Sequence, residues 1–356
     1  MRGRIAGILF LYTVIAAGQP RFVGGKPEIR PTGSNLEGTF RAFVAQTSGP
    51  AWIGYAVPAV PGEHNMCCDT SSDTSVGYRG CGLEPGSRPQ EAVPYGGPVR
   101  LEADQEFHVL FRVEQNQITR IRTFSSDCEL DASGTQVVWL TAVKPAENVA
   151  LLASFVAPAA ADRASERKQD AAVSGIALTA DRSADTQLAR FLATGQPESL
   201  RRKAAFWIGA ARRIQSLPAL SQVALQDSSD KVRESAVHGL TLSRDPAALE
   251  TVIGIAKNDK SPHVRGNALF WMANQAAAKA SAAIGNAIEN DPETKVKEQA
   301  VFALSRLPKD ESIPALIQIA RTNKNPAVKK KAMFWLGQSK DPRAIAFFEE
   351  VLTRRP

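Results

Sequence analysis

The sequence predicts a chain of two different parts: a small, mostly β domain held by disulfides, followed by an all-α solenoid. Three observations predict this fold class. Four cysteines fall between residues 67 and 128, among short segments of alternating or continuous apolar residues. One helical pattern then recurs at a constant interval, from residue 200 to residue 328. With 356 residues, the chain is also longer than one ordinary compact core requires.

Residues 1–18 have the three-part pattern of a secretory signal peptide. Arg2 and Arg4 precede an apolar run from Ile5 to Ala17, and cleavage is expected after Gly18. The run is shorter than the roughly 20 apolar residues that a membrane-spanning helix needs. No later segment is apolar enough to span a bilayer. We therefore expect an exported protein, periplasmic or extracellular, without a transmembrane anchor.

The four cysteines are expected to form two disulfides, because exported proteins reach an oxidising compartment. Cys67 and Cys68 are adjacent, so each should pair with one of the other two, Cys81 and Cys128. The sequence does not decide between these two pairings. A zinc site that combines His64 with some of the cysteines is less favoured, because the C-x-x-C spacing is missing.

Residues 19–156 are assigned to the mostly β domain. Five segments carry the apolar pattern of strands: GTFRAFVAQ, PAWIGYAVPAV, EFHVLFRV, ITRIRTF and TQVVWLTAV. Turns rich in Gly, Pro and Asp separate them, and no catalytic signature stands among them. Residues 157–182 are expected to form a linker with a degenerate half-repeat from Asp162 to Thr179, and residues 183–356 the solenoid.

The repeat is set by apolar anchors that recur with a period of 32: Leu200, Val232, Val264, Val296 and Val328. Alanine follows each anchor after four residues and a larger apolar residue after eight, which places all three on one helical face. A second apolar helix precedes each anchored helix. One such hairpin cannot bury its apolar stripe alone, so we expect neighbouring hairpins to stack into a curved solenoid.

These hairpins resemble the HEAT repeats, and more closely the short variant named for phycobilisome lyases. The V-R-x-x-A-x-x-x-L core of the anchored helix carries the resemblance, together with a loop acid six residues before its basic residue. The pairs are Asp227 with Arg233, Asp259 with Arg265, Asp291 with Lys297, and Asn323 with Lys329. The resemblance implies that such pairs form a ladder linking successive repeats, and that the anchored helices line a concave surface that holds another macromolecule. The ladder should weaken toward the C-terminus, where lysine and asparagine replace arginine and aspartate.

An aromatic column is expected beside the core face. Because each helical residue turns by about 100°, Trp207, Trp271 and Trp335, seven residues after their anchors, should point into the core. The position six residues after the anchor lies roughly 140° from the centre of that face. It holds Phe206, His238, Phe270, Phe302 and Phe334.

The phenylalanines of this column, with the nearby cations Arg202, Lys203, Lys330 and Lys331, are the candidate protein-binding residues. They would suit a partner with acidic and apolar groups. In the alternative interpretation, each ring wedges between neighbouring helices and meets no partner, because large exposed apolar patches are uncommon without function. The cations would then only keep the protein soluble.

The sequence favours a non-catalytic adaptor over an enzyme. Some enzymes that resemble the array bind iron through His-Glu dipeptides, and this chain has none. It also lacks a G-x-S-x-G motif, a P-loop and a dinucleotide fingerprint, so no catalytic residue, metal or cofactor is assigned. An envelope enzyme with its site in the β domain remains the first alternative.

The basic charge belongs to the helical part of the chain. From residue 183 to residue 356, 26 Lys and Arg against 17 Asp and Glu give +9, so the total of +7 leaves −2 for residues 1–182. Export argues against nucleic acid as the partner, and we expect a protein instead. The second alternative is an attachment module for anionic envelope polymers, whose binding would weaken steeply with salt.

Overall fold

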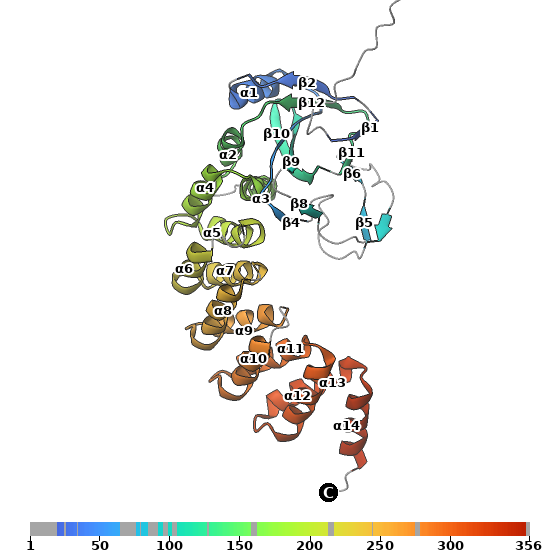
Figure 1. Cartoon of the computed structure of the whole chain (residues 1–356), viewed down its shortest axis with the longest axis vertical. Helices are drawn as coiled ribbons and strands as arrows, with labels where there is room; N and C mark the ends of the chain where they lie inside the picture. The colour runs from blue at the N-terminus through green and yellow to red at the C-terminus, as the bar shows by residue number, and fades with distance from the viewer. Residues whose placement is uncertain are drawn as a thin grey trace, which may run out of the picture. The chain divides into compact units, whose positions relative to one another are not determined.

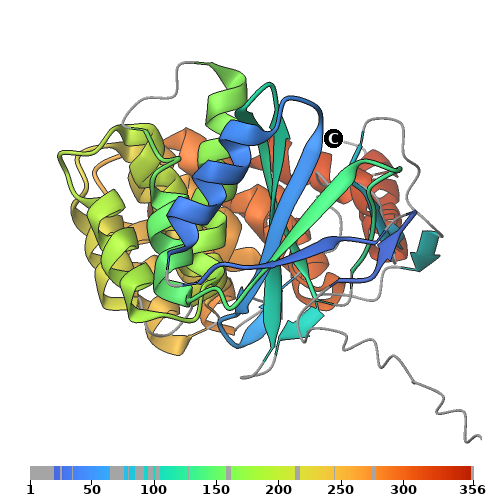
Figure 2. The same ribbon diagram turned by 90° about the horizontal axis from the view of Figure 1, so that it is seen from above.

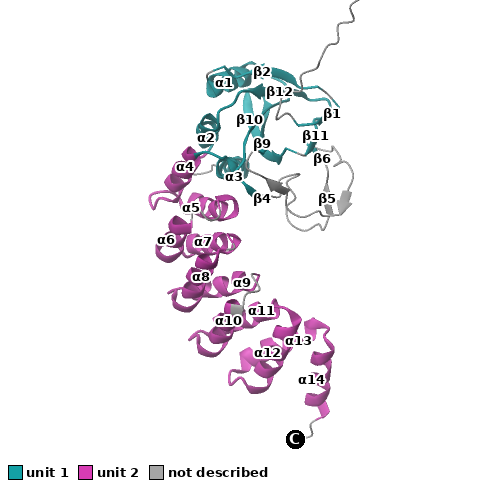
Figure 3. Ribbon diagram, in the orientation of Figure 1, with its two compact units in different colours: residues 1–155, 161–181 teal, residues 156–160, 182–356 magenta. Residues whose placement is uncertain are grey.

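The computed structural model describes residues 20–24, 26–33, 35–64, 76–78, 80–84, 92–94, 99–101, 105–126, 128–157, 162–212, 217–243, 245–274 and 278–353. The chain divides into two compact units (Figures 1 and 3). Unit 1 contains residues 1–155 and 161–181, and unit 2 contains residues 156–160 and 182–356. The expected signal peptide, residues 1–18, lies outside the described residues. Among the described helices, none combines the length and the apolar character needed to cross a membrane.

Unit 1 is built on a five-stranded mixed sheet with the strand order β10-β9-β3-β12-β2. The strands are β10 (Gln117–Ser125), β9 (Glu106–Glu114), β3 (Ala51–Pro58), β12 (Gln136–Thr141) and β2 (Glu28–Pro31). A smaller sheet joins β1 (Phe22–Val23), β11 (Glu129–Asp131) and β6 (Gly80–Gly82). Two further pairs are β4 (Gly62–His64) with β8 (Val99–Leu101), and β5 (Val76–Tyr78) with β7 (Ala92–Pro94).

Both faces of the large sheet are covered, which explains why its central strands are almost continuously apolar. Helices α1 (Leu36–Gln46), α2 (Pro145–Ala153) and α3 (Arg163–Leu178) lie on one side (Figure 2). On that side Phe40 of α1 meets Phe111 of β9 edge-on, with ring centroids 4.7 Å apart. On the other side Trp139 packs in one apolar cluster with Leu130 of the smaller sheet. Unit 1 is therefore a mixed α/β region, and the prediction of a mostly β domain holds only for its sheets.

The segment GTFRAFVAQ was predicted as a strand and instead belongs to helix α1. Asn35 caps this helix, because its Oδ1 accepts a hydrogen bond from the Gly38 amide at 2.9 Å. The buried residues Leu36, Phe40, Phe43 and Val44 follow the spacing of one helical face. The other four predicted strands correspond to β3, β9, β10 and β12.

Helix α3 covers most of the segment that the sequence assigned to a linker and a degenerate half-repeat. It packs on strand β10 of unit 1, where the Lys168 Nζ atom donates to the Ile118 carbonyl oxygen at 3.0 Å. A buried chain of hydrogen bonds also ties it to the sheet. Tyr55 of β3 donates to Asn148 of α2 at 2.8 Å, and Asn148 donates to Thr179 at the end of α3 at 2.7 Å.

Cys81 and Cys128 are buried in the same apolar cluster of unit 1. Within the part of the chain that the structure describes, no cysteine is a free thiol. Cys67 and Cys68 lie outside the described residues, so the two disulfides and their pairing stay predictions.

Unit 2 is a stack of helical hairpins in two rows. The first row contains α4 (Arg182–Leu192), α6 (Leu217–Gln226), α8 (Pro246–Asn258), α10 (Ala278–Asn290), α12 (Lys309–Thr322) and α14 (Pro342–Thr353). The second row contains α5 (Glu198–Trp207) with the π-helical turn η1 (Ile208–Arg212), then α7 (Asp230–Leu242), α9 (Pro262–Ala273), α11 (Thr294–Ser305) and α13 (Pro326–Ser339). Figure 3 shows that the second row follows the concave side of this stack.

The predicted apolar stripe forms the core between the rows. The anchors from Leu200 to Val328 are all buried, and so are the alanines four residues after them. Ser229 and Asn325 cap α7 and α13 with hydrogen bonds to backbone amides, while Ser261 at the start of α9 makes no such bond. Each anchor lies on one second-row helix, so the period of 32 residues in the sequence is the interval from one second-row helix to the next.

Candidate functional site

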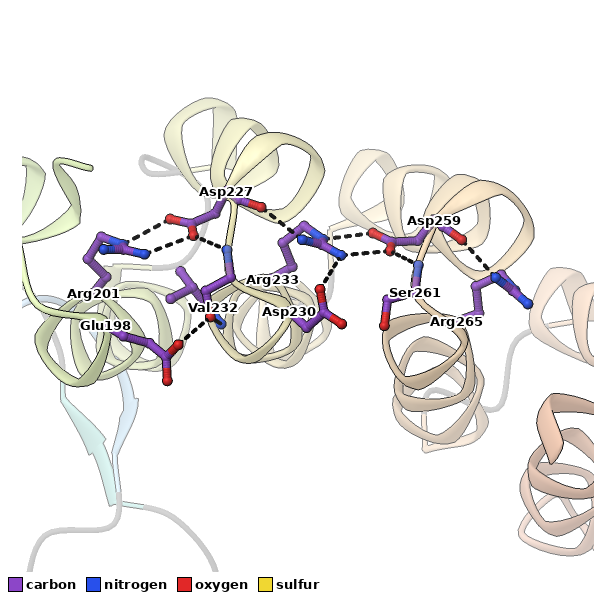
Figure 4. A network of polar contacts seen from close by, with 10 residues as sticks. Glu198, Arg201, Asp227, Asp230, Val232, Arg233, Asp259, Ser261 and Arg265 are labelled. Atoms are coloured by element: carbon purple, nitrogen blue, oxygen red, sulfur yellow. Dashed lines mark hydrogen bonds and ion pairs between the residues drawn. The ribbon is translucent and has the colours of Figure 1, made fainter. Parts of the chain in front are cut away.

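A ladder of ion pairs links successive hairpins of unit 2 (Figure 4). The Arg201 guanidinium donates to both carboxylate oxygens of Asp227, at 3.0 Å from Nε and 3.0 Å from Nη2. The next two rungs repeat this fork, with distances between 2.8 and 3.0 Å: Arg233 with Asp259, and Arg265 with Asp291. Each carboxylate thus pairs with the arginine 26 residues before it, in the preceding hairpin.

The same aspartates also accept hydrogen bonds from residues of their own hairpin. The backbone oxygen of Asp227 accepts from Arg233 Nη1 at 2.8 Å, and its Oδ1 accepts from the Ser229 amide at 2.8 Å. The acid and base that stand six residues apart in the sequence are therefore joined through the backbone carbonyl. Hydrogen bonding to Asp259 also raises the pKa of Arg233, so this buried guanidinium stays charged.

The ladder changes at Lys297, where the sequence replaces arginine. Its Nζ donates to the Glu289 carbonyl oxygen at 2.7 Å. Asn323 occupies the next aspartate position and donates to the Glu289 carboxylate at 3.3 Å. It keeps the turn, because its Oδ1 accepts from the Asn325 amide at 2.9 Å. The two-pronged ionic link is thus replaced by single hydrogen bonds at this step.

Aromatic side chains form a continuous series along the second row, which we call the aromatic column. Its members are Phe206, Trp207, His238, Phe270, Trp271, Phe302, Phe334 and Trp335. Neighbouring rings in the column have centroids between 3.5 and 5.6 Å apart. All of them are half-buried except Phe334, which is 51% exposed. The rings therefore pack between repeats and still present part of their surface to solvent.

The column alternates between two kinds of step. His238 stacks on Trp271 with a centroid distance of 3.5 Å, and Phe302 stacks on Trp335 at 4.9 Å. At the other steps the position of the tryptophan holds Gly239 or Ala303. There the rings six residues after the anchor meet directly, Phe206 with His238 at 5.3 Å and Phe270 with Phe302 at 5.6 Å.

The tryptophans were predicted to point into the core, and this is wrong: all three are half-buried members of the column. Each packs edge-on against the phenylalanine that precedes it in its own helix. A helical wheel of one helix does not include the neighbouring helix, and rings of that helix stack on two of the three indoles, Trp271 and Trp335. The presence of Phe-Trp pairs in every second repeat was the signal for this alternation.

His238 is a neutral member of the column at neutral pH. Burial lowers the pKa of its imidazole to about 4. An uncharged ring can stack on Trp271 without removing a charge from water.

The candidate cations lie at the two ends of the column. Arg202 on α5 and Lys330 on α13 are exposed, whereas Lys203 and Lys331 are half-buried. The Lys331 Nζ atom lies 5.8 Å from the ring centroid of Phe334 and 5.9 Å from that of Trp335. The predicted cations and rings thus meet most closely on α13.

Glu84, a partly buried carboxylate of unit 1, bears on the enzymatic alternative. Glu84 accepts from Trp52 Nε1 at 2.8 Å and from Arg112 Nη2 at 3.1 Å. Burial raises the pKa of Glu84, but these hydrogen bonds outweigh it and hold the pKa below its usual value. The geometry is that of a structural ion pair, not of a general acid. Within the described residues, no three His, Cys, Asp or Glu side chains are grouped as a metal site.

Comparison with known proteins places the helical unit in a family. No curated protein sequence matches the chain. The solved structure of human deoxyhypusine hydroxylase is 15% identical, covers 60% of this chain and 92% of its own, and has a TM-score of 0.28. The structure of YibA from E. coli is 20% identical, covers 60% of this chain and 77% of its own, and has a TM-score of 0.39. A family model described as HEAT repeats matches residues 186–273 and 281–356, so the C-terminal part of this chain, residues 186–356, consists of HEAT repeats.

Proposed function

We propose that this protein is a non-catalytic adaptor whose HEAT repeats hold a segment of another protein against the aromatic column. The observation that carries the proposal is the column itself, which runs over five helices of the concave row, α5, α7, α9, α11 and α13, and keeps every ring partly exposed. HEAT repeats generally mediate protein binding. Large aromatic side chains are also the residues that contribute most at protein interfaces.

The surrounding structure holds the column in place before any partner arrives. Bidentate ion pairs fix α5, α7 and α9 relative to the following hairpins. The rings are also packed against one another, some stacked and some edge-on, so little side-chain entropy remains to be lost on binding. A partner segment could therefore gain the burial of the exposed ring surfaces, at about 25 cal/mol per Å² of apolar area, with little ordering cost on this side.

A photocrosslinking experiment tests this proposal in the native cell. A photoreactive phenylalanine analogue placed at position 334 should give discrete crosslinked products. The same analogue at position 225 is the matched control, because Leu225 is 57% exposed but lies on α6 of the first row. The same products from both positions, or none from position 334, would contradict binding at the column.

We further propose that the protein acts outside the cytoplasm, with Cys67 and Cys68 bonded to Cys81 and Cys128. The signal-peptide pattern of residues 1–18 and the burial of Cys81 and Cys128 support this proposal. A fusion of the segment from Met1 to Val60 to alkaline phosphatase, an enzyme active only after export, should be active in whole cells. Deletion of residues 2–17 should abolish that activity, and equal activity of the two fusions would refute export.

A further inference from the structure

The exposed apolar surface of the aromatic column is concentrated on α13. Phe334 is 51% exposed and the preceding residue, Met333, is 37% exposed. The equivalent residues of the preceding repeat, in α11, are Val301, which is fully buried, and Phe302, which is half-buried between two rings. Phe334 has only one ring neighbour among the described residues, Trp335.

Two cations lie beside this apolar surface on α13, and a third lies on the same face of α11 as Phe302. Lys331 lies over the rings of Phe334 and Trp335, and Lys330 is its exposed neighbour. Arg306 follows Phe302 by four residues, so it lies on the same helical face, at the exposed end of α11. Among the ion pairs that join described residues, none includes Arg306, Lys330 or Lys331.

Two cations on the neighbouring helices α12 and α14 are paired with acidic side chains. Arg321 pairs with Glu350, and Arg343 pairs with Asp310 at 3.2 Å. At the opposite end of the column, Arg202 acts electrostatically on Glu234 of α7, so both signs of charge are present there. Only the end at α13 combines an exposed ring with cations that lack acidic partners among the described residues.

We infer that this end of the column binds an acidic and apolar segment, in which carboxylates flank an aromatic or large aliphatic side chain. The binding residues are Arg306, Lys330, Lys331, Met333 and Phe334, which we call the α13 patch. This inference rests on the proposed function and adds the chemistry of the partner. The apolar side chain packs on Met333 and Phe334, while the carboxylates pair with the three cations. A basic segment is excluded, because like charges at such short range are repulsive.

The positions of the α13 side chains favour this complementarity. Lys331 already lies over two rings, so its ammonium group loses little freedom when a carboxylate approaches. The charge of the patch also attracts acidic segments from a distance, and this attraction weakens as salt screens it. Affinity should therefore depend on both the apolar side chain and the acids.

Selection from a library of short random peptides tests the inference on the full chain. Peptides enriched on the unmodified protein should carry Asp or Glu next to Phe, Trp or Leu. Phe334→Ala, and separately the double variant Lys330→Glu with Lys331→Glu, should each weaken the leading peptide at least tenfold in fluorescence anisotropy. Leu225→Ala and the double variant Lys257→Glu with Lys260→Glu are the matched controls, because all three residues are exposed outside the second row. Both controls should stay within twofold.

A complementary measurement does not depend on the folding of any variant. Replacing the acids of the leading peptide by Asn and Gln should weaken its binding to the unmodified protein at least tenfold. If neutral or basic peptides are enriched and still depend on Phe334, the acidic partner is wrong but the proposed function stands. If no enriched peptide depends on Phe334, Phe302 or Phe270, both are wrong.

Discussion

Asp259 and Asn323 occupy the same place in two repeats, yet they make different bonds. Asp259 accepts two hydrogen bonds from the buried Arg233, both at 2.9 Å. Asn323 instead contacts the exposed Glu289 at 3.3 Å. Without Asp259, the buried Arg233 keeps only one carboxylate partner among the described residues, the exposed side chain of Asp230 at 2.8 Å. Losing this two-pronged ionic link should cost more than losing the single hydrogen bond of Asn323 to an exposed carboxylate.

Asp259→Ala should therefore lower the free energy of unfolding by about 3 kcal/mol. Asn323→Ala is the matched variant and should lower it by about 1 kcal/mol, since it loses one long hydrogen bond to the exposed carboxylate of Glu289 and the turn that its Oδ1 stabilises. Urea denaturation of the two variants measures the difference. Equal losses would mean that the ionic rungs contribute no more than the turn itself.

His238 should make the stability of the protein depend on pH. Burial lowers the pKa of this group from 6.5 to about 4 in the folded state, so the unfolded chain binds a proton more readily between these values. Stability should consequently fall as the pH drops through this window. The imidazole is partly exposed, so the loss is discounted to on the order of 1 kcal/mol.

The variant His238→Phe should lack this part of the pH dependence, because phenylalanine does not titrate. It should also fit, since Phe occupies the same position in the other repeats. The test compares melting temperatures at pH 7.5 and pH 5. The melting temperature of the unmodified protein should fall further between these two pH values than that of the variant. His263→Gln is the control, since His263 is exposed. An identical pH response of His238→Phe and the unmodified protein would exclude the imidazole as the cause.

At the scale of elements, the approach of α5 to α7 depends on a glycine. A Cβ atom on Gly239 would lie 2.7 Å from the carbonyl oxygen of Ala205, too close for any real contact. A Cβ atom on Gly254 of α8 would have no neighbouring atom within 4 Å. Because both residues are helical, the two sites isolate the effect of the neighbouring helix.

Gly239→Ala should destabilise the protein by about 1 to 3 kcal/mol, because the helices must move apart. Gly254→Ala should instead stabilise it by about 0.5 to 1 kcal/mol, because alanine restricts the unfolded chain and fits the helix. Chemical denaturation of the two variants gives the signs. Stabilisation by both changes would show that the close approach is not required.

The helices of unit 2 could be predicted from the sequence because five repeats carry the same apolar pattern. An unusual residue at one position therefore does not hide the period of 32 residues. Helix α1 could not, because its apolar residues alternate over a short segment as in a strand, and only the Asn35 cap points to a helix. The pattern of α3 indicated a helix but not its packing partner, the sheet of unit 1. The ladder residues from Asp227 to Asp291 were identified from the sequence, but Arg201 was not among them, and the pairing across 26 positions required the geometry between hairpins.

On the scale of the whole solenoid, stability is expected to vary along the stack, because each hairpin contacts only its neighbours. Helices α7 and α9 have neighbours on both sides, and their hairpins carry the ionic rungs. Leu352 of α14 is 84% exposed, while Ala320, its counterpart in α12, is 4% exposed. The hairpins near α14 therefore have less buried area and weaker links.

Backbone amides of α12, α13 and α14 should exchange with deuterium earlier than those of α7, α8 and α9. Hydrogen exchange followed by mass spectrometry of peptides resolves these regions. Uniform protection across the six helices would mean that the solenoid opens only as a whole.

Because an indole alternates with glycine or alanine from one repeat to the next, the true repeating unit of the aromatic column is two hairpins and not one. Excising residues 232–263 would put Trp207 and Trp271 in consecutive repeats, where the present order always sets a glycine or an alanine between two indoles. Excising residues 232–295 would instead make Ala303 follow Trp207 in the order of repeats, as Gly239 does now. The solenoid can therefore be shortened or lengthened without repacking only by an even number of hairpin units.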